Sequence, residues 1–233
     1  MILKVLQRLT LLDFPGKIAA TVFTGGCNFR CPFCHNASLV FPEMIGKDIS
    51  LDDFFAFLDS RVGRIDGVCI SGGEPTLMSD LPDFIREIKA RGFLVKLDTN
   101  GSNPEMLSVL IDAGLLDYVA MDIKNSPEKY AETIGLSEEK TEKILEQVKK
   151  SASILMEGRV DFEFRTTVMP ELHSKTDMTE IGRWLSGDEK FFLQSYREDG
   201  DQIVGGFTPP TSEELSELLY ELKRFIPNAN IRY

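Results

Sequence analysis

Three of the four cysteines of this chain lie close together in the stretch CNFRCPFC, residues 27–34. Cys27, Cys31 and Cys34 have the spacing C-x3-C-x2-C, so one loop can present three thiolates to the same metal centre. A structural zinc ion normally has four protein ligands, often arranged as two separated pairs. Three cysteines in one loop are better suited to a four-iron iron–sulfur cluster in which one iron has no protein ligand. The spacing therefore predicts a cluster whose open iron can bind a small molecule.

The alternatives to such a cluster depend on the neighbouring residues. His35 directly follows Cys34, but adjacent residues rarely reach the same metal ion, so we expect that His35 is not a ligand. Cys69 lies in an apolar run, where a cysteine usually acts as a small buried hydrophobe. The trio could also be a purely structural metal site. The protein would then be colourless and bind zinc, whereas an iron–sulfur protein is brown.

The composition excludes some kinds of partner. The 233 residues include 42% hydrophobic and 27% charged residues, as in an ordinary globular protein. The net charge of −11 is opposite to that of a nucleic-acid-binding surface, so we expect no nucleic acid partner and attribute the acidity to solubility. No apolar run is long enough to cross a membrane, and residues 1–16 lack the cleavage site of a signal peptide. We therefore expect a cytoplasmic protein with reduced thiols and no membrane partner.

Strands and helices that alternate along the chain must position these cysteines. Runs rich in β-branched and aromatic residues predict six strands, at 18–24, 67–71, 93–99, 117–123, 160–168 and 190–196. Helical spacing predicts helices at 50–62, 80–92, 103–114, 137–152, 177–187 and 211–225. This alternation indicates an α/β fold with a parallel sheet and outer helices. Six units are fewer than the eight of a closed barrel, so we expect a partial (β/α)6 TIM-like barrel, with an open doubly wound sheet as the alternative.

Several predicted helices carry capping signals. Ser50 precedes the first helix and is followed three residues later by Asp53. Thr211 and Glu214 form the pattern of a capping box at the start of the last helix. Gly92 is a C-terminal cap for the helix at 80–92.

Polar or glycine-rich residues follow every predicted strand at its carboxyl end. In chain order the stretches are GGCNFRC (25–31), SGGEP (71–75), DTNG (98–101), MDIK (121–124), FRTT (164–167) and SYRE (195–198). The carboxyl ends of parallel strands meet at one rim of the sheet, which is where α/β enzymes place their chemistry. We therefore predict that the functional site lies at this rim.

Taken together, these motifs resemble those of the radical S-adenosylmethionine (SAM) enzymes. CNFRCPFC matches the C-x3-C-x-Φ-C signature of that family, with Phe33 as the aromatic residue, and GGEP at 72–75 matches its second motif. DTNG and MDIK look like two further regions of the activases of glycyl radical enzymes. Residues 11–36 and 162–173 are similar to the activating proteins of anaerobic ribonucleoside-triphosphate reductase, and less closely to those of pyruvate formate-lyase. The resemblance covers nearly the whole chain and implies one radical SAM domain over residues 1–233.

The resemblance implies that the three cysteines hold a [4Fe-4S] cluster and that its open iron binds the amino and carboxylate groups of SAM. Gly72 and Gly73 lack a Cβ and would let the backbone approach the amino group. Glu74 would accept a hydrogen bond from that group, and Pro75 would fix the turn. A GGEP stretch alone would indicate only a tight turn at a strand end.

Further SAM-binding residues are implied at the ends of the third to fifth predicted strands. Lys124 would pair with the carboxylate of SAM, and Thr99 would line the same site. Asp98 and Asp122 would flank the SAM site at the strand ends, together with a monovalent cation as in related activases. For Asp98, a solvated salt bridge at the strand rim is an equal alternative. Arg165 would form part of a polar interior wall that holds SAM.

Phe33 has two possible roles, and Arg197 differs from the residue found in related activases. Phe33 would pack on the adenine of SAM, or would make only a core contact. Activases of pyruvate formate-lyase have a histidine after the sixth strand, where this chain has Arg197. A guanidinium can hydrogen-bond a ribose or a carboxylate, but it cannot titrate near neutral pH.

The implied reaction starts with one-electron reduction of SAM, which yields methionine and a 5′-deoxyadenosyl radical. This radical would remove hydrogen from a glycine of a partner, predicted to be anaerobic ribonucleotide reductase, in an oxygen-free setting. Flavodoxin or ferredoxin would donate the electron. The alternatives are activation of pyruvate formate-lyase or another glycyl radical enzyme, or radical chemistry on a small molecule, as in the short deazapurine ring-contracting enzymes.

Overall fold

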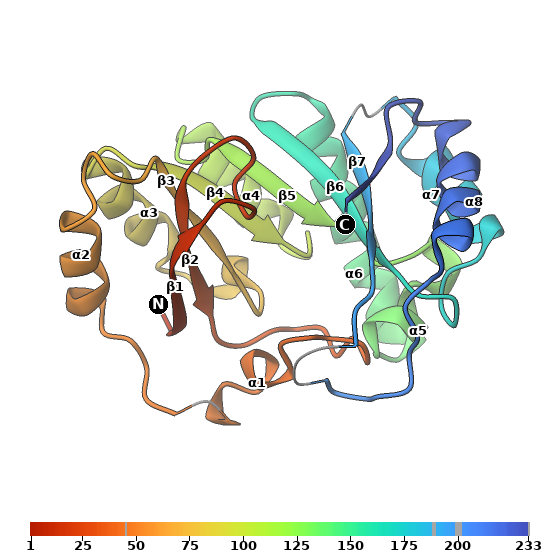
Figure 1. The fold of residues 1–233 in the computed structure, drawn as a ribbon, viewed down its shortest axis with the longest axis horizontal. Helices are drawn as coiled ribbons and strands as arrows, with labels where there is room; N and C mark the ends of the chain where they lie inside the picture. The colour runs from red at the N-terminus through yellow and green to blue at the C-terminus, as the bar shows by residue number, and fades with distance from the viewer. Residues whose placement is uncertain (45, 188–189, 199–201, 233) are drawn as a thin grey trace.

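The computed structural model describes residues 1–44, 46–187, 190–198 and 202–232. Its strands form one sheet in the order of the chain, and the sheet bends into an arch (Figure 1). The strands are β1 (Leu3–Thr10), β2 (Ala19–Thr24), β3 (Gly67–Gly72), β4 (Leu94–Thr99), β5 (Tyr118–Asp122), β6 (Asp161–Val168), β7 (Phe191–Ser195) and β8 (Asn230–Arg232). β1 pairs antiparallel with β2, and all other neighbours are parallel.

The six predicted strands correspond to β2–β7, whereas the sequence did not predict the two edge strands. β1 is largely exposed and contains Lys4, Gln7 and Arg8, so it lacks the apolar run of a central strand. β8 has only three residues, which is too short for a periodic signal.

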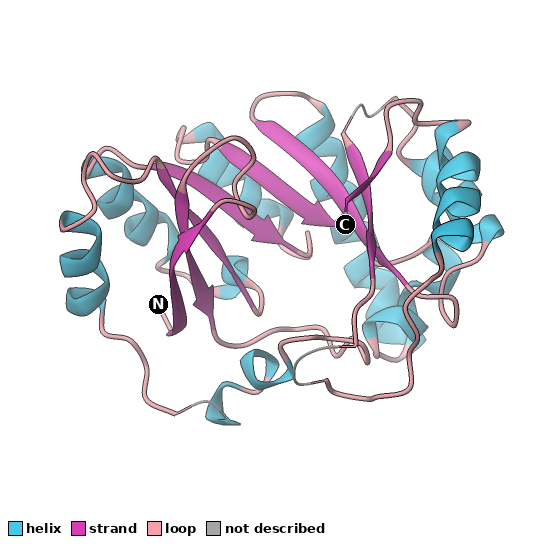
Figure 2. Ribbon diagram, viewed as in Figure 1, coloured by secondary structure: helices cyan, strands magenta, loops and turns pink. Residues whose placement is uncertain are grey.

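The helices are α1 (Ala37–Val40), α2 (Leu51–Asp59), α3 (Leu81–Ala90), α4 (Pro104–Asp112), α5 (Tyr130–Ile134), α6 (Glu138–Met156), α7 (Lys175–Trp184) and α8 (Ser212–Lys223). The six longer helices cover the outside of the arch (Figure 2). The longer ones, α2, α3, α4, α6, α7 and α8, match the six predicted helices. α1 and α5 are too short to show helical periodicity and were not predicted. None of the helices in the described ranges is long and apolar enough to span a membrane.

The capping predictions are confirmed. Ser50 Oγ accepts a hydrogen bond from the backbone N–H of Asp53 at 3.0 Å. Thr211 and Glu214 form a complete capping box at the start of α8. Gly92 has a φ of +85°, a left-handed conformation in which it follows the last turn of α3.

The partial (β/α)6 barrel with outer helices is also confirmed. The strand order follows the chain without the reversal of a doubly wound sheet, because each crossover packs its helix on the same outer face. α3 illustrates the packing, since Leu81, Phe84, Ile85 and Ile88 repeat at helical spacing and are all buried. The cysteine loop that follows β2 crosses the open side of the arch with α1 (Figure 1).

Candidate active site

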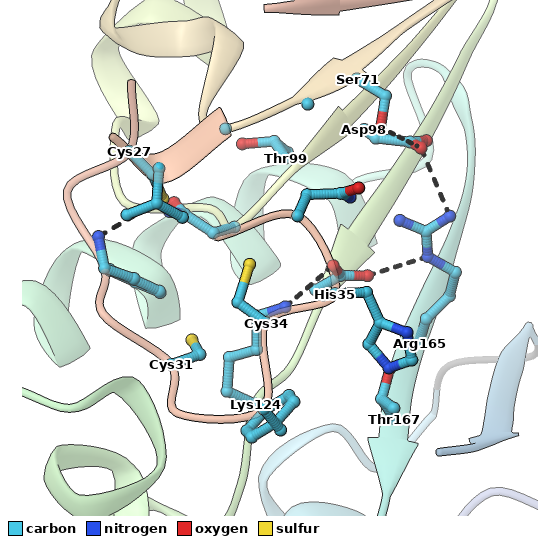
Figure 3. Close-up of a pocket in the computed structure, with 18 residues that line it drawn as sticks. Cys27, Cys31, Cys34, His35, Ser71, Asp98, Thr99, Lys124, Arg165 and Thr167 are labelled. Carbon is cyan, nitrogen blue, oxygen red and sulfur yellow. Dashed lines mark hydrogen bonds and ion pairs between the residues drawn. The ribbon is translucent and has the colours of Figure 1, made fainter. Parts of the chain in front are cut away.

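A pocket lies at the carboxyl ends of β2–β6, at the rim where the sequence predicts the functional site (Figure 3). Most of the predicted site residues line this pocket. These residues are Cys27, Cys31, Phe33, Cys34, Gly72, Gly73, Asp98, Thr99, Asp122, Lys124 and Arg165. Glu74, Pro75 and Arg197 do not line it.

The cysteine loop is held in shape by Arg30. The Arg30 guanidinium donates hydrogen bonds to the carbonyl oxygens of Cys27 at 2.6 Å and Phe29 at 2.7 Å. It lies over the ring of Phe41, with its central carbon 4.9 Å from the ring centroid. The backbone N–H of Arg30 donates to the carbonyl oxygen of Ile134 at 2.8 Å. The loop is therefore anchored to both α5 and the segment after α1.

The thiols are set up for a metal centre rather than for free nucleophilic chemistry. Burial raises the pKa of Cys27 to about 11 and that of Cys31 to about 12, so both are neutral thiols without a metal. Metal binding would release their protons. Among the described residues, no three His, Cys, Asp or Glu side chains are arranged to hold a single metal ion. The donor set fits a cluster, in which each thiolate binds a separate iron, better than mononuclear zinc.

Gly72 and Gly73 pack directly against the backbone that leads into the cysteine loop. The N–H of Gly73 donates to the carbonyl oxygen of Thr24 at 2.9 Å, and the next N–H donates to that of Gly26 at 2.8 Å. A Cβ on Gly73 would lie 2.0 Å from the oxygen of Gly26, and one on Gly72 would lie 2.4 Å from the nitrogen of Thr24. Both glycines also line the pocket. The absence of a Cβ is therefore needed for packing as well as for ligand access.

Glu74, which the resemblance places near the amino group of SAM, does not line the pocket. Its side chain is fully buried, and its carboxylate accepts hydrogen bonds from Thr99 Oγ1 at 2.8 Å and from the N–H groups of Asn100 at 2.6 Å and Thr76 at 3.1 Å. Burial raises the pKa of Glu74. Glu74 thus ties the end of β3 to the end of β4, and Pro75 starts a buried 3-10 turn beside it.

A network of charges lines the pocket from the cysteine loop to β6 (Figure 3). Arg165 Nε donates to Asp122 Oδ1 at 2.8 Å, and Arg165 Nη1 lies 3.6 Å from Asp98 Oδ2. Lys124 Nζ donates to Asp122 Oδ2 at 3.0 Å. Burial by itself would raise the pKa of Asp122, but Arg165 and Lys124 lower it to about 2. Both carboxylates therefore stay ionised and paired with cations.

Ser71, Asn100 and Thr167 also line the pocket, although the sequence did not predict them as site residues. Ser71 Oγ donates to Asp98 Oδ2 at 3.0 Å. Asn100 Nδ2 donates to Asn28 Oδ1 at 3.0 Å and lies 3.9 Å from Cys27 Sγ. Their places within two residues of Gly72, Thr99 and Arg165 were the available signal, because neighbouring residues at a strand end share the rim.

Of the two residues Phe33 and Arg197, only Phe33 lines the pocket. Phe33 lines the pocket and packs edge-on against Phe207, with ring centroids 6.2 Å apart. Arg197 is exposed and does not line the pocket, so its predicted contact with SAM stays a prediction. The preceding Tyr196 is buried, and its ring centroid lies 5.1 Å from that of His35.

The backbone of Lys124 is held by a histidine that the sequence did not mark. His173 is buried, and its Nε2 lies 2.9 Å from the carbonyl oxygen of Lys124. The N–H of Met169 donates to Nδ1 of the same ring at 3.4 Å, so Nε2 carries the proton and donates it to Lys124. The N–H of Lys124 in turn donates to the Tyr130 hydroxyl at 3.4 Å. His173 in its neutral form therefore positions Lys124.

Replacing His173 with glutamine is expected to reduce the loss of stability at acid pH. Burial holds the pKa of His173 below its ordinary value of 6.5, with Lys129 favouring and Asp177 opposing the shift. The unfolded chain therefore binds a proton more readily, so this contribution is complete above about pH 6.5 and is lost as the pH falls. Urea unfolding between about pH 7.5 and 5 would measure it. Identical pH slopes for the variant and the wild type would contradict this prediction.

Comparison with known proteins identifies the family of this chain. Residues 21–174 match the Radical SAM superfamily. A Methanocaldococcus jannaschii protein provisionally named a glycyl-radical enzyme activating enzyme is 33% identical over 227 residues, covering 96% of this chain and 92% of that protein. The pyruvate formate-lyase 1-activating enzyme of Escherichia coli K12 is 26% identical over 239 residues, with 92% of each chain covered.

A solved structure shares the fold. The crystal structure of Streptococcus suis SuiB bound to S-adenosylmethionine aligns with a TM-score of 0.66 and 15% sequence identity. The alignment covers 90% of this chain and 48% of SuiB, so this chain spans about half the length of that protein. At this identity the likeness concerns the fold alone.

Proposed function

Because this chain belongs to the radical SAM superfamily and is related over its length to glycyl-radical enzyme activating enzymes, we propose that it activates an anaerobic ribonucleoside-triphosphate reductase. The observation that carries the proposal is the single pocket that brings the cysteine trio to one rim with Asp122, Lys124 and Arg165. The choice of reductase is supported by the resemblance of residues 11–36 and 162–173.

In this proposal, Cys27, Cys31 and Cys34 hold the [4Fe-4S] cluster that the family uses. When bound, the cluster and SAM supply a 5′-deoxyadenosyl radical by one-electron cleavage of the C5′–S bond. The chain's own contribution is to position SAM and to exclude water. The ammonium of Lys124 is free to turn one donor toward a carboxylate while it keeps its bond to Asp122.

Other residues in and beside the pocket lining are assigned to the amino group and the adenine of SAM. Gly72 and Gly73 offer backbone to the amino group of SAM, and Phe33 offers a ring to the adenine. Glu74 acts from behind, because its hydrogen bonds fix the positions of Thr99 and Asn100. Fixed donors and charges of this kind orient a reactant at little reorganisation cost.

The partner would supply a glycine at the mouth of this pocket. Transfer of a hydrogen atom from the glycine Cα to the 5′-deoxyadenosyl radical gives 5′-deoxyadenosine and leaves a glycyl radical on the partner. The electron for SAM cleavage would come from a reduced flavodoxin or ferredoxin. A cytoplasmic location remains the expectation for a protein with these partners.

The test is anaerobic activation of two candidate partners in parallel. The iron-reconstituted protein is incubated with dithionite, SAM and either anaerobic ribonucleotide reductase or pyruvate formate-lyase. We expect a glycyl radical doublet by electron paramagnetic resonance on the reductase and 5′-deoxyadenosine by chromatography. A radical on the lyase alone would replace the proposed partner. Formation of 5′-deoxyadenosine without a radical on either enzyme would favour a small-molecule substrate.

A further inference from the structure

Lys96 places a buried ammonium group directly behind the pocket. It lies on β4 two residues before Asp98, so both side chains point to the same face of the sheet. Lys96 is only 1% exposed, and its Nζ donates to Asp98 Oδ1 and lies 3.7 Å from the sulfur of Cys69. Burial of a lysine is costly unless the charge is paired. The pair with Asp98 explains how the ammonium can be buried there.

With this pair, both oxygens of Asp98 have a hydrogen-bond donor and a positive charge close by. Oδ1 is bonded to Lys96. Oδ2 accepts a hydrogen bond from Ser71 at 3.0 Å and faces Arg165 at 3.6 Å. Burial alone would raise the pKa of Asp98, but Arg165 and Lys96 lower it, so the carboxylate is ionised and already neutralised.

Both oxygens of Asp122 are likewise bonded to cations. Its Oδ1 accepts from Arg165 at 2.8 Å, and its Oδ2 accepts from Lys124 at 3.0 Å. Arg165 therefore bridges the space between the two carboxylates, where the resemblance places a monovalent cation. The residues present do not fit that ion, because the positive charges of Lys96 and Arg165 already lie beside these carboxylates and would repel Na⁺ or K⁺.

The balance of charge leads to the same conclusion. Three cations, Lys96, Lys124 and Arg165, surround two anions, Asp98 and Asp122. The carboxylate of bound SAM would make this group neutral. Without Lys96, the four remaining side chains and the SAM carboxylate would carry one net negative charge, which would attract a cation to this position.

We infer that the ammonium of Lys96 replaces the monovalent cation in this chain, so that SAM binding and cleavage need no added Na⁺ or K⁺. The inference about cleavage rests on the proposed function. The part that concerns ion binding depends only on the charges and contacts of Lys96, Asp98 and their neighbours.

The first test measures ion binding to the iron-reconstituted protein with bound SAM and without a reductant, so it needs no activity. Equilibrium dialysis uses thallium(I), a stand-in for potassium, with the wild type, Lys96→Met and Lys89→Met. Lys89 is a matched control because it pairs with Asp117 at 2.7 Å outside the pocket. We expect binding to Lys96→Met and none to the other two. One thallium(I) bound to the wild type, abolished by Asp98→Asn, would overturn the inference.

The second test measures 5′-deoxyadenosine formation in potassium, sodium and tetramethylammonium salts at equal ionic strength. The wild-type rates should agree within about twofold, since only general screening differs. Lys96→Met should lose about tenfold in tetramethylammonium and recover in potassium or sodium, because the ion restores the missing charge. Wild-type activation of about tenfold by potassium would overturn the inference even if Lys96→Met fails to fold. Absence of product from the wild type in every salt would instead refute the proposed function, and the dialysis would still decide the ion-binding question.

Discussion

Replacing any one of Cys27, Cys31 and Cys34 with serine is expected to abolish SAM cleavage while the fold persists. Even residues behind a metal's ligands typically change affinity or activity by about 10–100-fold, so loss of a ligand should cost at least about a hundredfold. Anaerobic reconstitution followed by iron and sulfide analysis, the brown absorbance and chromatography of 5′-deoxyadenosine would measure the effect. The three positions are expected to behave alike, because all three line the same pocket from one loop.

Cys69→Ser is the matched control for these variants. Cys69 is buried on β3 and does not line the pocket, and a serine hydroxyl can accept a hydrogen bond from the nearby Lys96. This variant should keep its iron, sulfide and colour. Full cluster content in a variant of the trio, or loss of the cluster in Cys69→Ser, would contradict the assignment of the ligands.

Gly73→Ala is expected to have the second largest effect, because the added methyl group collides with backbone rather than with a flexible side chain. The new Cβ would lie 2.0 Å from the carbonyl oxygen of Gly26, directly before the cysteine loop. Relief requires the loop to move, and overpacking of this kind typically costs about 1–3 kcal/mol of stability. A displacement near 1 Å at a reacting centre can cost about a hundredfold in rate.

The measurements for Gly73→Ala are the midpoint of urea unfolding, the cluster content and the rate of 5′-deoxyadenosine formation. Gly46→Ala is a suitable control, since an added Cβ there meets nothing within 4 Å and the residue has no positive φ. The control should match the wild type in all three. Unchanged SAM cleavage by Gly73→Ala would show that the close approach to Gly26 does not position the site.

The central strands and the longer helices were predictable because their signals are local. An apolar run such as that of β5, or the spacing of Leu81, Phe84 and Ile88 in α3, depends only on neighbours in the chain. β1 was not predictable in the same way. β1 is an edge strand that pairs only with β2, and much of it is exposed to solvent. Its sequence therefore lacks the apolar run of a central strand.

Glu74 and Lys96 show what the sequence could not predict about the site. The GGEP motif placed Glu74 at the rim, but only the fold shows that its carboxylate accepts hydrogen bonds from Thr99 and Asn100 at the end of β4. Lys96 lies in the middle of a predicted strand, where a lone charged residue indicates nothing without its neighbours. Its contact with Cys69 depends on the register of β3 against β4, and its pairing with Asp98 becomes significant only because the fold buries both side chains.

The sequence by itself determined the identity and spacing of the three thiols, the order of the strands along the chain and the rim at which they end. These properties are set by short-range geometry, because a loop's spacing and a strand's alternation involve only residues near one another in the chain. The tertiary structure alone decided which charges meet. Arg165 and Asp122 are 43 positions apart and Ser71 and Asp98 are 27 apart, and only the parallel register brings each pair into contact. The balance of charge in the pocket is therefore a property of the folded sheet, since Coulomb interactions depend on distance in space and not on distance along the chain.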